Sequence, residues 1–346
     1  MTAPARIAVV GAGMIGQAHI KRVLREPEAL LAGIADPAPQ SKAQAEALGV
    51  AWAPDIEPLL AQTKPDGVVI ATPNQLHVPN GMAAVRAGVP MLLEKPVADD
   101  VERALALTVA AEQAHVPILV GHHRRHSALI QRAKEVIASG RLGRLIAVNG
   151  LSWFRKPSAY FDGTNAWRRN AGGGVVLINL IHVVDDVRNL CGDIVSVQAT
   201  ESHAARGFEV EDTAAIVLHF ANGALGTLTI SDTVAAPWSW EMTSGEDKAF
   251  PHADQFCYMI GGTEASITVP RLDIWSHTGD GWRTPLQSER VFLPEQDPLT
   301  AQMRHFIEVV RGQAEPIISG REGARTLEAT LAVKRAAASG TTVRLG

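Results

Sequence analysis

A glycine-rich turn near the start of the chain is the first feature whose residue types and spacing indicate chemistry. The run Gly11-Ala12-Gly13-Met14-Ile15-Gly16 follows an apolar segment, Arg6–Val10, and opens a helical pattern. In such a motif the first glycine permits a tight turn, the second lets the backbone approach a pyrophosphate, and the third lets the helix pack close to the strand. Phosphates then bind the free N–H groups of the helix N-terminus. We therefore expect a dinucleotide site that includes Gly11, Gly13, Met14, Ile15 and Gly16.

An acidic residue completes this motif. Asp36 ends the next apolar segment, at about the 20-residue distance from Gly16 where a carboxylate binds the adenosine ribose hydroxyls. Its charge would repel a ribose phosphate, no arginine follows closely, and Lys42 is the nearest cation. The sequence therefore predicts NAD as the cofactor, with NADP less favoured.

Lys95 is the first candidate for catalysis. Glu94-Lys95-Pro96 directly follows the apolar segment Pro90–Leu93, and ligands of open α/β sheets bind beyond the carboxyl ends of the strands. A partly buried lysine can polarise a substrate hydroxyl and share its proton. The position therefore favours a functional lysine over a solvated loop lysine.

A second candidate lies after the triple glycine Gly172-Gly173-Gly174. The helix predicted to follow it carries Asn179, His182, Asp185 and Asp186, and helical spacing places the first two and one or both aspartates on one face. A carboxylate near an imidazole fixes its tautomer and raises its basicity. A core histidine bonded to a backbone carbonyl is the alternative, and the residues alone leave both open.

Two further segments carry polar or aromatic groups. The run His122-His123-Arg124-Arg125-His126 lacks a carboxylate or a cysteine, so we expect no metal and interpret it as a positive wall of the active cleft. The segment from Trp238 to His252, with Trp240 and Glu241, either caps a sugar-like substrate or lies in a subunit interface.

The elements that must position these residues divide the chain into two parts. Up to residue 122, short apolar strands alternate with helical patterns, which predicts a doubly wound parallel sheet covered on both faces. The expected strands are Arg6–Val10, Leu31–Ala35, Gly67–Ala71, Pro90–Leu93 and Pro117–Val120, and the expected helices are Met14–Arg25, Gln40–Leu48, Gln75–Ala87 and Val101–His115.

In residues 123–346 strand-like runs follow one another without intervening helices, which favours an antiparallel sheet. The expected strands are Ile194–Thr200, Thr213–His219, Ala224–Ser231, Phe256–Ile260, Ala265–Val269 and Asp273–His277, and the expected helices are Ser127–Ser139, Val175–Leu190, Leu299–Arg311 and Arg321–Ser339. We thus predict an α/β protein with a dinucleotide-binding domain at 1–122 and a substrate-binding domain at 123–346.

Composition narrows the class of protein. The 346 residues are 46% hydrophobic with a formal net charge of −4, which argues against disorder and against a nucleic-acid partner. Cys191 and Cys257 are far apart, so a disulfide framework and a thiolate zinc site are not expected. The chain lacks an apolar run of membrane-spanning length and a basic leader. We therefore expect a cytoplasmic protein with no membrane partner.

These features together resemble the glucose–fructose oxidoreductase and inositol dehydrogenase family (Gfo/Idh/MocA) over essentially the whole chain. The pair formed by Glu94-Lys95-Pro96 and the Gly-Gly-Gly…His-x-x-Asp segment is much more specific than the glycine turn. The other matching motifs are Ala35-Asp36-Pro37, Ala71-Thr72-Pro73 with His77, Trp167-Arg168, His182-Val183-Val184-Asp185 and the tail from Asp297-Pro298-Leu299.

The resemblance implies a Rossmann domain followed by an α/β domain whose large, open antiparallel sheet often packs into homodimers or homotetramers. Members mostly oxidise sugars, cyclitols or related alcohols, or run the reverse reduction, and Lys95 and His182 match their usual catalytic pair. Positions matching Arg124, Trp167 and Arg168 often face cofactor or substrate. The residues matched to the nicotinamide end of the cofactor site are Thr72, Pro73, Asn74, His77 and Glu94.

One position departs from the family pattern. Many members carry a substrate-binding aspartate four residues before the catalytic histidine, where this chain has Ile178, followed by Asn179. Asn179 as a neutral substitute would suit a substrate of different polarity, such as a carboxylated ring like quinate. Two other functions stay open, an NAD-assisted glycosidase without net redox and a dinucleotide-binding regulator. Retention of both Lys95 and His182 favours an enzyme.

Overall fold

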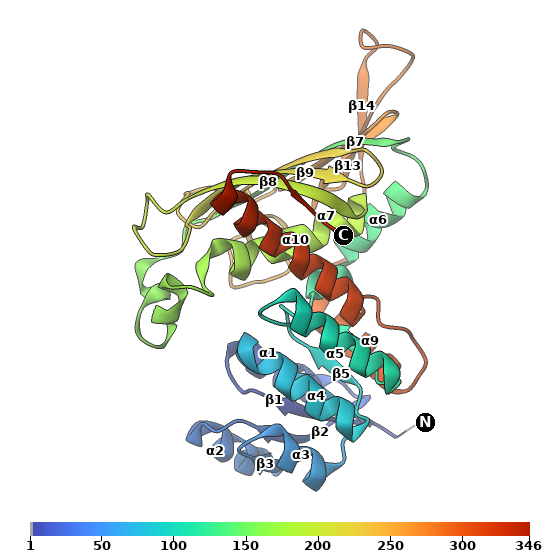
Figure 1. The fold of residues 1–346 in the computed structure, drawn as a ribbon. Coiled ribbons are helices and arrows are strands. Elements are labelled where there is room, and N and C mark those ends of the chain that lie inside the picture. The colour runs from blue at the N-terminus through green and yellow to red at the C-terminus, as the bar shows by residue number, and fades with distance from the viewer. Residues whose placement is uncertain (1–2) are drawn as a thin grey trace. The chain divides into compact units, whose positions relative to one another are not determined.

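The computed structural model describes residues 3–346, and contacts within the chain divide it into two compact units (Figure 1). The first unit runs to His126 and also includes Pro298–Leu327, and the second comprises Ser127–Asp297 and Glu328–Gly346. The C-terminal part therefore contributes to both units. The boundary expected at residue 122 stays a prediction of where separately folding domains meet.

The first unit is built on a six-stranded parallel sheet in the order β3-β2-β1-β4-β5-β6. The order runs outward in both directions from β1 and β4, so the carboxyl ends of these two strands flank the switch point where doubly wound sheets bind ligands. The predicted Rossmann fold is confirmed. The strands are β1 (Ala5–Val10), β2 (Ala29–Ala35), β3 (Ala51–Ala53), β4 (Gly67–Ile70), β5 (Met91–Leu93) and β6 (Ile118–Val120).

Local sequence signals explain where the helices of this unit begin and end. The Asp100 carboxylate accepts a hydrogen bond from Arg103 N and starts α5 (Val101–Gln113). Gly49 and Gly88, with φ of 68° each, end α2 (Pro39–Leu48) and α4 (His77–Ala87). The other helical segments are α1 (Met14–Arg25), α3 (Ile56–Thr63), η1 (Asn74–Leu76), η2 (His123–His126) and α9 (Pro298–Val310).

The turn between β1 and α1 packs closely against other backbone atoms at two of its glycines. A Cβ atom on Gly16 would lie 1.9 Å from the Gly11 carbonyl oxygen. Gly11 has φ of 89°, and its Cβ would lie 2.5 Å from the carbonyl oxygen of Ala71, just beyond β4. The turn is therefore fixed to the end of β4, and only glycine fits at either position.

The second unit contains a nine-stranded sheet in the order β14-β13-β12-β11-β7-β10-β9-β8-β15. Its neighbours pair antiparallel except β7 and β10, which are parallel, so the expected antiparallel sheet is mixed at one pair. Three strands were not predicted: β7 (Leu145–Trp153), β14 (Leu286–Arg290) and β15 (Val343–Arg344). The others are β8 (Ile194–Ser202), β9 (Thr213–Phe220), β10 (Leu225–Ser231), β11 (Tyr258–Gly262), β12 (Ala265–Val269) and β13 (Asp273–His277).

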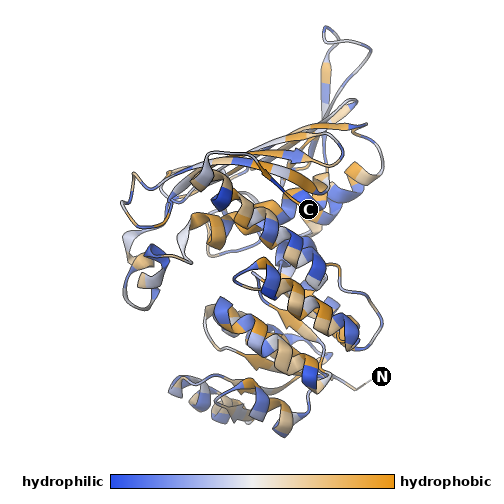
Figure 2. Cartoon of the chain, in the orientation of Figure 1, coloured by the Kyte–Doolittle hydropathy of each residue, from blue (hydrophilic) through white to orange (hydrophobic). Residues whose placement is uncertain are grey.

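Helices cover one face of this sheet. The face bears buried residues such as Ile216, Leu218 and Leu228, which form one core with α7 (Ile181–Cys191) and the C-terminal half of α10 (Gly320–Ser339). Figure 2 shows hydrophobic colour along many strands and polar colour on the outer sides of the helices. The remaining helical segments are α6 (Ala128–Ala138), η3 (Ser158–Phe161), η4 (Gly163–Arg169), η5 (Val176–Leu180) and α8 (Trp240–Thr243).

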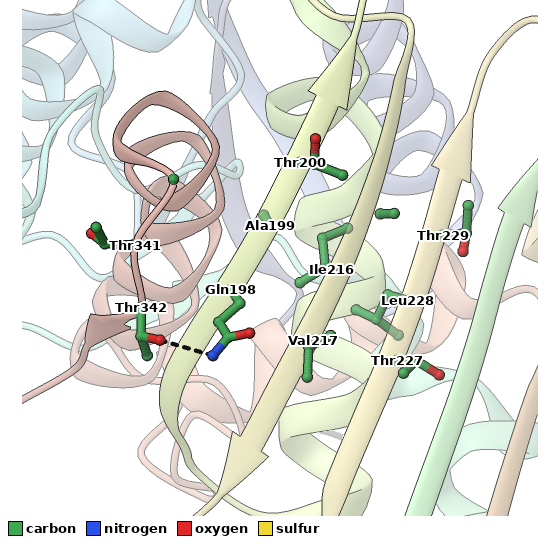
Figure 3. A pocket seen from close by; sticks show the side chains of 12 residues that line it. Gln198, Ala199, Thr200, Ile216, Val217, Thr227, Leu228, Thr229, Thr341 and Thr342 are labelled. Atoms are coloured by element: carbon green, nitrogen blue, oxygen red, sulfur yellow. Dashed lines mark hydrogen bonds between the residues drawn. The ribbon is translucent and has the colours of Figure 1, made fainter.

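The opposite face of the sheet is open within this unit. Side chains on β8, β9 and β10 alternate between buried and exposed, as expected of a sheet with one covered face. A shallow hollow of about 590 Å³ lies on this part of the unit, where Gln198 donates a hydrogen bond to Thr342 at 2.8 Å (Figure 3). No helix within residues 3–346 is long and apolar enough to cross a membrane.

Gly16 and Gly13 of the turn between β1 and α1 allow a matched stability test. We expect Gly16→Ala to lower the free energy of unfolding by about 1–3 kcal/mol or more, because its methyl group overlaps the Gly11 carbonyl. Gly13→Ala should leave stability nearly unchanged, because apart from Gly13 and its chain neighbours no atom of residues 3–346 lies within 4 Å of the added carbon. Thermal unfolding of both variants measures the difference, and equal melting temperatures would contradict the packing described above.

Candidate active site

The carboxyl edge of the parallel sheet brings several of the predicted residues together. The glycine turn touches the Ala71–Thr72 peptide, as described above. Thr72 in turn accepts a hydrogen bond from Asn80, through Asn80 Nδ2 and Thr72 Oγ1 at 3.1 Å. The predicted cofactor positions after β4 therefore lie directly beside the glycine turn.

His77 ties this segment to the loop after β5. Its Nδ1 lies 2.6 Å from the Pro96 carbonyl oxygen, and its Nε2 lies 2.8 Å from the Thr72 carbonyl oxygen. Burial lowers the pKa of His77, and the two carbonyl partners only partly offset this effect. Because a neutral imidazole has one N–H, the ring donates to only one carbonyl at a time. His77 thus connects the segment after β4 to the loop after β5, beside the predicted site.

Glu94 forms a buried pair that the sequence did not reveal. Its Oε1 lies 2.7 Å from Nε2 of His19 on α1, and both side chains are buried. Burial alone would raise the pKa of Glu94, but the His19 hydrogen bond, with the charges of His19, Lys95 and His123, holds it below its ordinary value. Glu94 is therefore a carboxylate at neutral pH. The position of His19 three residues after Gly16 was the available signal.

Lys95 follows this pair at the edge of the sheet. Its backbone N–H donates to Glu94 Oε2 at 3.3 Å. A Cβ atom on Gly121, just beyond β6, would lie 2.8 Å from Glu94 Cδ, so the carboxylate fills the space between β5 and β6. The structure therefore places Lys95 where topology predicted, on a tightly held backbone.

Asp36 is held by the backbone around it. Oδ2 accepts from Ala12 N at 2.7 Å, and Oδ1 accepts from Ala38 N at 2.8 Å. The first bond joins the end of β2 directly to the glycine turn. Because each carboxylate oxygen has two lone pairs, both oxygens can still accept a bond from a ribose hydroxyl.

The start of α1 fits a bound pyrophosphate. No side chain of the described residues caps this helix, and its N-cap residue Gly13 has open space within 4 Å of a would-be Cβ. The first N–H groups of a twelve-residue helix and its positive dipole end therefore face that space.

The structure limits the charge of the expected positive wall at residues 122–126 to its two arginines. Burial lowers the pKa of His123 to about 3, helped by Arg124, and burial with His305 lowers that of His126 to about 3. These two rings are therefore neutral, and the positive charge belongs to Arg124 and Arg125, which are themselves buried. Arg125 Nη2 lies 3.6 Å from Glu322 Oε2, so part of its charge is compensated.

In the second unit, the helix predicted over Val175–Leu190 begins with a π-helical turn. Val176–Leu180 forms η5 and leads into α7, which carries His182 with 9% of its surface exposed. π-helical turns inside helices often occur at functional sites. Asp186 accepts a hydrogen bond from the buried Tyr258 hydroxyl at 2.8 Å, so this aspartate ties α7 to the sheet.

Asn179 contacts a lysine that the sequence analysis missed. Lys156 Nζ donates to Asn179 Oδ1 at 2.7 Å and lies 3.4 Å from Asp232 Oδ2. Burial lowers the pKa of Lys156 to about 8, with Arg168 adding to the shift and Asp232 opposing it. A buried lysine with a lowered pKa therefore contacts Asn179, which lies one helical turn before His182.

Trp167 and Arg168 lie on η4 beside the same group. The Arg168 guanidinium stacks 4.0 Å from the centre of the Tyr160 ring and donates to the Tyr160 carbonyl at 3.1 Å, while Trp167 is 48% exposed. Trp240, by contrast, is buried and stacks on Tyr258. Trp240 thus supports the core, whereas Trp167 is accessible.

Lys95 belongs to the first unit and His182 to the second. Their action on one substrate oxygen therefore stays a prediction, as do the roles assigned to Arg124, Trp167, Arg168 and Asn179.

Comparison with known proteins gives independent information on both units. Residues 5–122 match an oxidoreductase family described by its NAD-binding Rossmann fold, and residues 130–268 match the GFO/IDH/MocA C-terminal domain. The chain is 29% identical over 288 residues to 1,5-anhydro-D-fructose reductase of Ensifer adhaerens, covering 82% of this chain and 81% of that protein. It is 28% identical over 341 residues to inositol 2-dehydrogenase of Rhizobium meliloti (strain 1021), covering 96% and 97%.

A solved structure supports the same relationship. The WlbA dehydrogenase of Bordetella pertussis, crystallised with NADH and UDP-GlcNAcA, matches with a TM-score of 0.82 at 26% identity. The match covers 99% of this chain and 99% of that chain.

The low pKa of Lys156 can be measured directly. In protein with carbon-13-labelled lysine, the Lys156 signal, assigned through Lys156→Gln, should titrate with a midpoint of about 8. Since the pKa is lowered, the ammonium is fully charged only well below this pH and loses its proton as the pH rises through it. The signal of Lys134, an exposed lysine that also donates to an asparagine, is the control and should be unchanged in Lys156→Gln. A Lys156 midpoint near 10.5 would contradict the buried environment.

Proposed function

Because the chain belongs to the Gfo/Idh/MocA family of NAD-binding oxidoreductases, we propose that it transfers a hydride between nicotinamide and a secondary alcohol or ketone. The proposed substrate is a sugar, a cyclitol or a related polyhydroxylated small molecule. The observation that carries the proposal is the sheet edge where the glycine turn, Asp36, His77 and the Glu94–Lys95 segment meet. The similarity to 1,5-anhydro-D-fructose reductase and to inositol 2-dehydrogenase supports the same class of reaction.

In the proposed site, NAD when bound supplies the hydride acceptor. The pyrophosphate is held by the glycine turn, and Asp36 binds the adenosine ribose. The residues of the turn assigned to this role are Gly11, Gly13, Met14, Ile15 and Gly16. The nicotinamide end is assigned to Thr72, Pro73, Asn74, His77 and Glu94. The fit rests on the open helix N-terminus and on the lone pairs that Asp36 retains.

Lys95 and His182 are the proposed catalytic residues. A carbinol carbon loses hydride readily only if its hydroxyl proton is removed as the carbonyl forms. An imidazole with an unperturbed pKa of about 6.5 suits that transfer, so His182 takes the proton, and Lys95 polarises the oxygen. Arg124, Trp167, Arg168 and Asn179 are the proposed substrate-side residues.

We also propose that the protein forms a homodimer or homotetramer in a cytoplasmic compartment. The open face of the nine-stranded sheet supports self-association, since exposed apolar residues such as Val217, Leu225 and Met259 lie on it. β14 and the loop before it extend away from the rest of this sheet (Figure 1), with Trp282 84% exposed. Cys191 and Cys257 are buried free thiols, which suit a reducing compartment.

A substrate screen tests the function directly. Incubation with NAD and a panel of sugars, cyclitols and sugar acids should give net NADH, measured by fluorescence, with at least one member. Cleavage of a glycoside without net NADH would favour an NAD-assisted glycosidase instead. NAD binding without turnover of either kind would favour a regulator.

Asp36 sets the predicted cofactor preference. By calorimetry the protein should bind NAD more tightly than NADP, and Asp36→Ala should narrow the gap because the repulsion of a ribose phosphate is lost. Asp66→Ala is the matched control, since it also removes a carboxylate that accepts a backbone N–H but lies outside the motif. Equal or tighter binding of NADP by the unaltered protein would refute the assignment.

Removal of either proposed catalytic group should affect turnover more than folding. Lys95→Met and His182→Asn should each lower kcat by about 10²–10⁴-fold, with NAD affinity within about tenfold. His182→Asn should also remove the ascending limb of the pH–rate profile, because its imidazole accepts the proton only when neutral. Lys21→Met and His203→Asn, at exposed positions, are the controls. Normal turnover by either catalytic variant would exclude that residue from the mechanism.

A further inference from the structure

Lys156 is held in place just beyond the central strand β7. Its backbone N–H donates to the Asp232 carbonyl at 2.9 Å, and the neighbouring Arg155 forms a bridge with Thr233. The side chain is only 8% exposed. Its ammonium group lies against the aromatic rings of Tyr160 and Phe154, at 4.7 and 5.4 Å from their centres. The group therefore has one defined position.

The carboxylate nearest to this ammonium is shared with a second cation. Asp232 Oδ1 accepts from Arg206 Nε at 2.8 Å, and the Asp232 carbonyl accepts from Arg206 Nη2 at 2.6 Å. Lys156 lies farther away, at 3.4 Å from Oδ2. Asp232 thus serves two cations, and the charge of Glu241 affects the pKa of Lys156 less than the opposing charge of Arg168 does. The local balance is positive.

The contact with Lys156 fixes the orientation of the Asn179 amide. An ammonium group has only donors, so the amide oxygen must face it, as the 2.7 Å contact requires. The Asn179 NH₂ group then points elsewhere, and the described residues offer it no acceptor. Asn179 is partly exposed, so this amide nitrogen can reach a ligand.

Arg168 is a third hydrogen-bond donor, and it packs against the same aromatic ring as Lys156. Its guanidinium and the Lys156 ammonium both lie against Tyr160, at 4.0 and 4.7 Å from the ring centre. It donates a hydrogen bond to the Tyr160 carbonyl, and no side-chain carboxylate within residues 3–346 pairs with it. The group formed by Lys156, Asn179 and Arg168, here termed the donor cluster, therefore presents hydrogen-bond donors almost exclusively.

We propose that the donor cluster selects substrates that carry a carboxylate, so that the natural substrate is a sugar acid or a carboxylated cyclitol. The inference rests on the proposed function and specifies its substrate. Asn179 precedes His182 by one helical turn, so the carboxylate would bind near the carbon that is oxidised. Lys156 is a specificity-determining residue in this account.

The chemistry of the cluster explains the selection. A carboxylate accepts several charge-assisted hydrogen bonds at once, whereas a neutral hydroxyl also has a proton that must find an acceptor. An aspartate at the position of Asn179 would supply that acceptor, and the amide does not. A carboxylate also suits the site better than a phosphate, because its single charge costs less to desolvate beside a nearly buried ammonium.

The pKa of Lys156 supports this assignment. Burial lowers this pKa to about 8, and the charges of Asp232 and Glu241, opposed by Arg168, do not fully offset the effect of burial. A bound carboxylate would supply the missing charge and raise this pKa. Binding of acids should therefore weaken as the pH rises above about 8, where the unliganded lysine loses its proton.

Matched substrate pairs test the proposal. Glucuronate differs from glucose only by a carboxylate in place of the hydroxymethyl group, quinate and myo-inositol compare a carboxylated with a neutral cyclitol, and glucose 6-phosphate represents phosphates. The unaltered protein should prefer an acid over its neutral partner by at least about tenfold in kcat/KM, the size expected for a hydrogen bond to a charged group. Preference for the neutral partners or for the phosphate would overturn the proposal.

Variants assign the preference to the cluster. Lys156→Gln should lower kcat/KM for acids at least about tenfold more than for neutral partners, and Lys156→Arg should restore most of the preference. Asn179→Asp should shift the preference toward neutral polyols, because it replaces a donor by an acceptor. Lys134→Gln, which removes an exposed lysine–asparagine bond, should leave the preference unchanged. Equal losses on acids and neutral partners in Lys156→Gln, at an unchanged melting temperature, would overturn the proposal.

Direct binding separates this inference from the proposed function. Calorimetric titration of the NADH-loaded protein with the same acids and neutral partners requires no turnover. If no compound is oxidised, the proposed function fails, but a preference for acids that Lys156→Gln abolishes still supports the donor cluster. If neutral polyols are oxidised and acids neither bind nor react, the proposed function stands and the inference is wrong.

Discussion

The buried hydrogen bond between His19 and Glu94 joins the helix behind the glycine turn to the loop that carries Lys95. His19 is fully buried and Glu94 nearly so, and removal of one partner of such a pair typically costs about 3–5 kcal/mol, because a buried charge is left alone. The same carboxylate receives the Lys95 backbone N–H. The cofactor turn and the proposed catalytic lysine are therefore positioned by one interaction, and a shift in α1 would move both.

Much of the first unit could be predicted from the sequence, because its strands and helices are strongly periodic and its glycine motif has a fixed geometry. β3 and α3 were missed, since β3 has three residues and α3 contains Pro58. His19 was missed as a partner of Glu94 because 75 residues separate the two. No local pattern encodes such a pair.

The structure of the second unit was harder to predict from the sequence, for a physical reason. In β7 burial alternates, but the buried positions include Gly150 and Ser152 while Leu151 and Trp153 lie on the other face. The sequence therefore shows no apolar–polar alternation, and the strand was missed. Lys156 follows that strand, and its partners Asn179 and Asp232 come from η5 and the end of β10. Their meeting depends on the pairing of β7 with β10. The sequence identified Asn179, but the lysine that orients its amide became visible only in the fold.

The central claim is that this chain removes a hydride from a carbon and delivers it to nicotinamide, while its side chains handle the proton. The most direct measurement uses a substrate deuterated at the carbon to be oxidised, with NMR of both products. The account predicts NADH with one deuterium at C4 of the ring and an oxidised product that has lost it. Deuterium retained in the product, or returned to it while NAD is recovered unchanged, would contradict net oxidation by this protein.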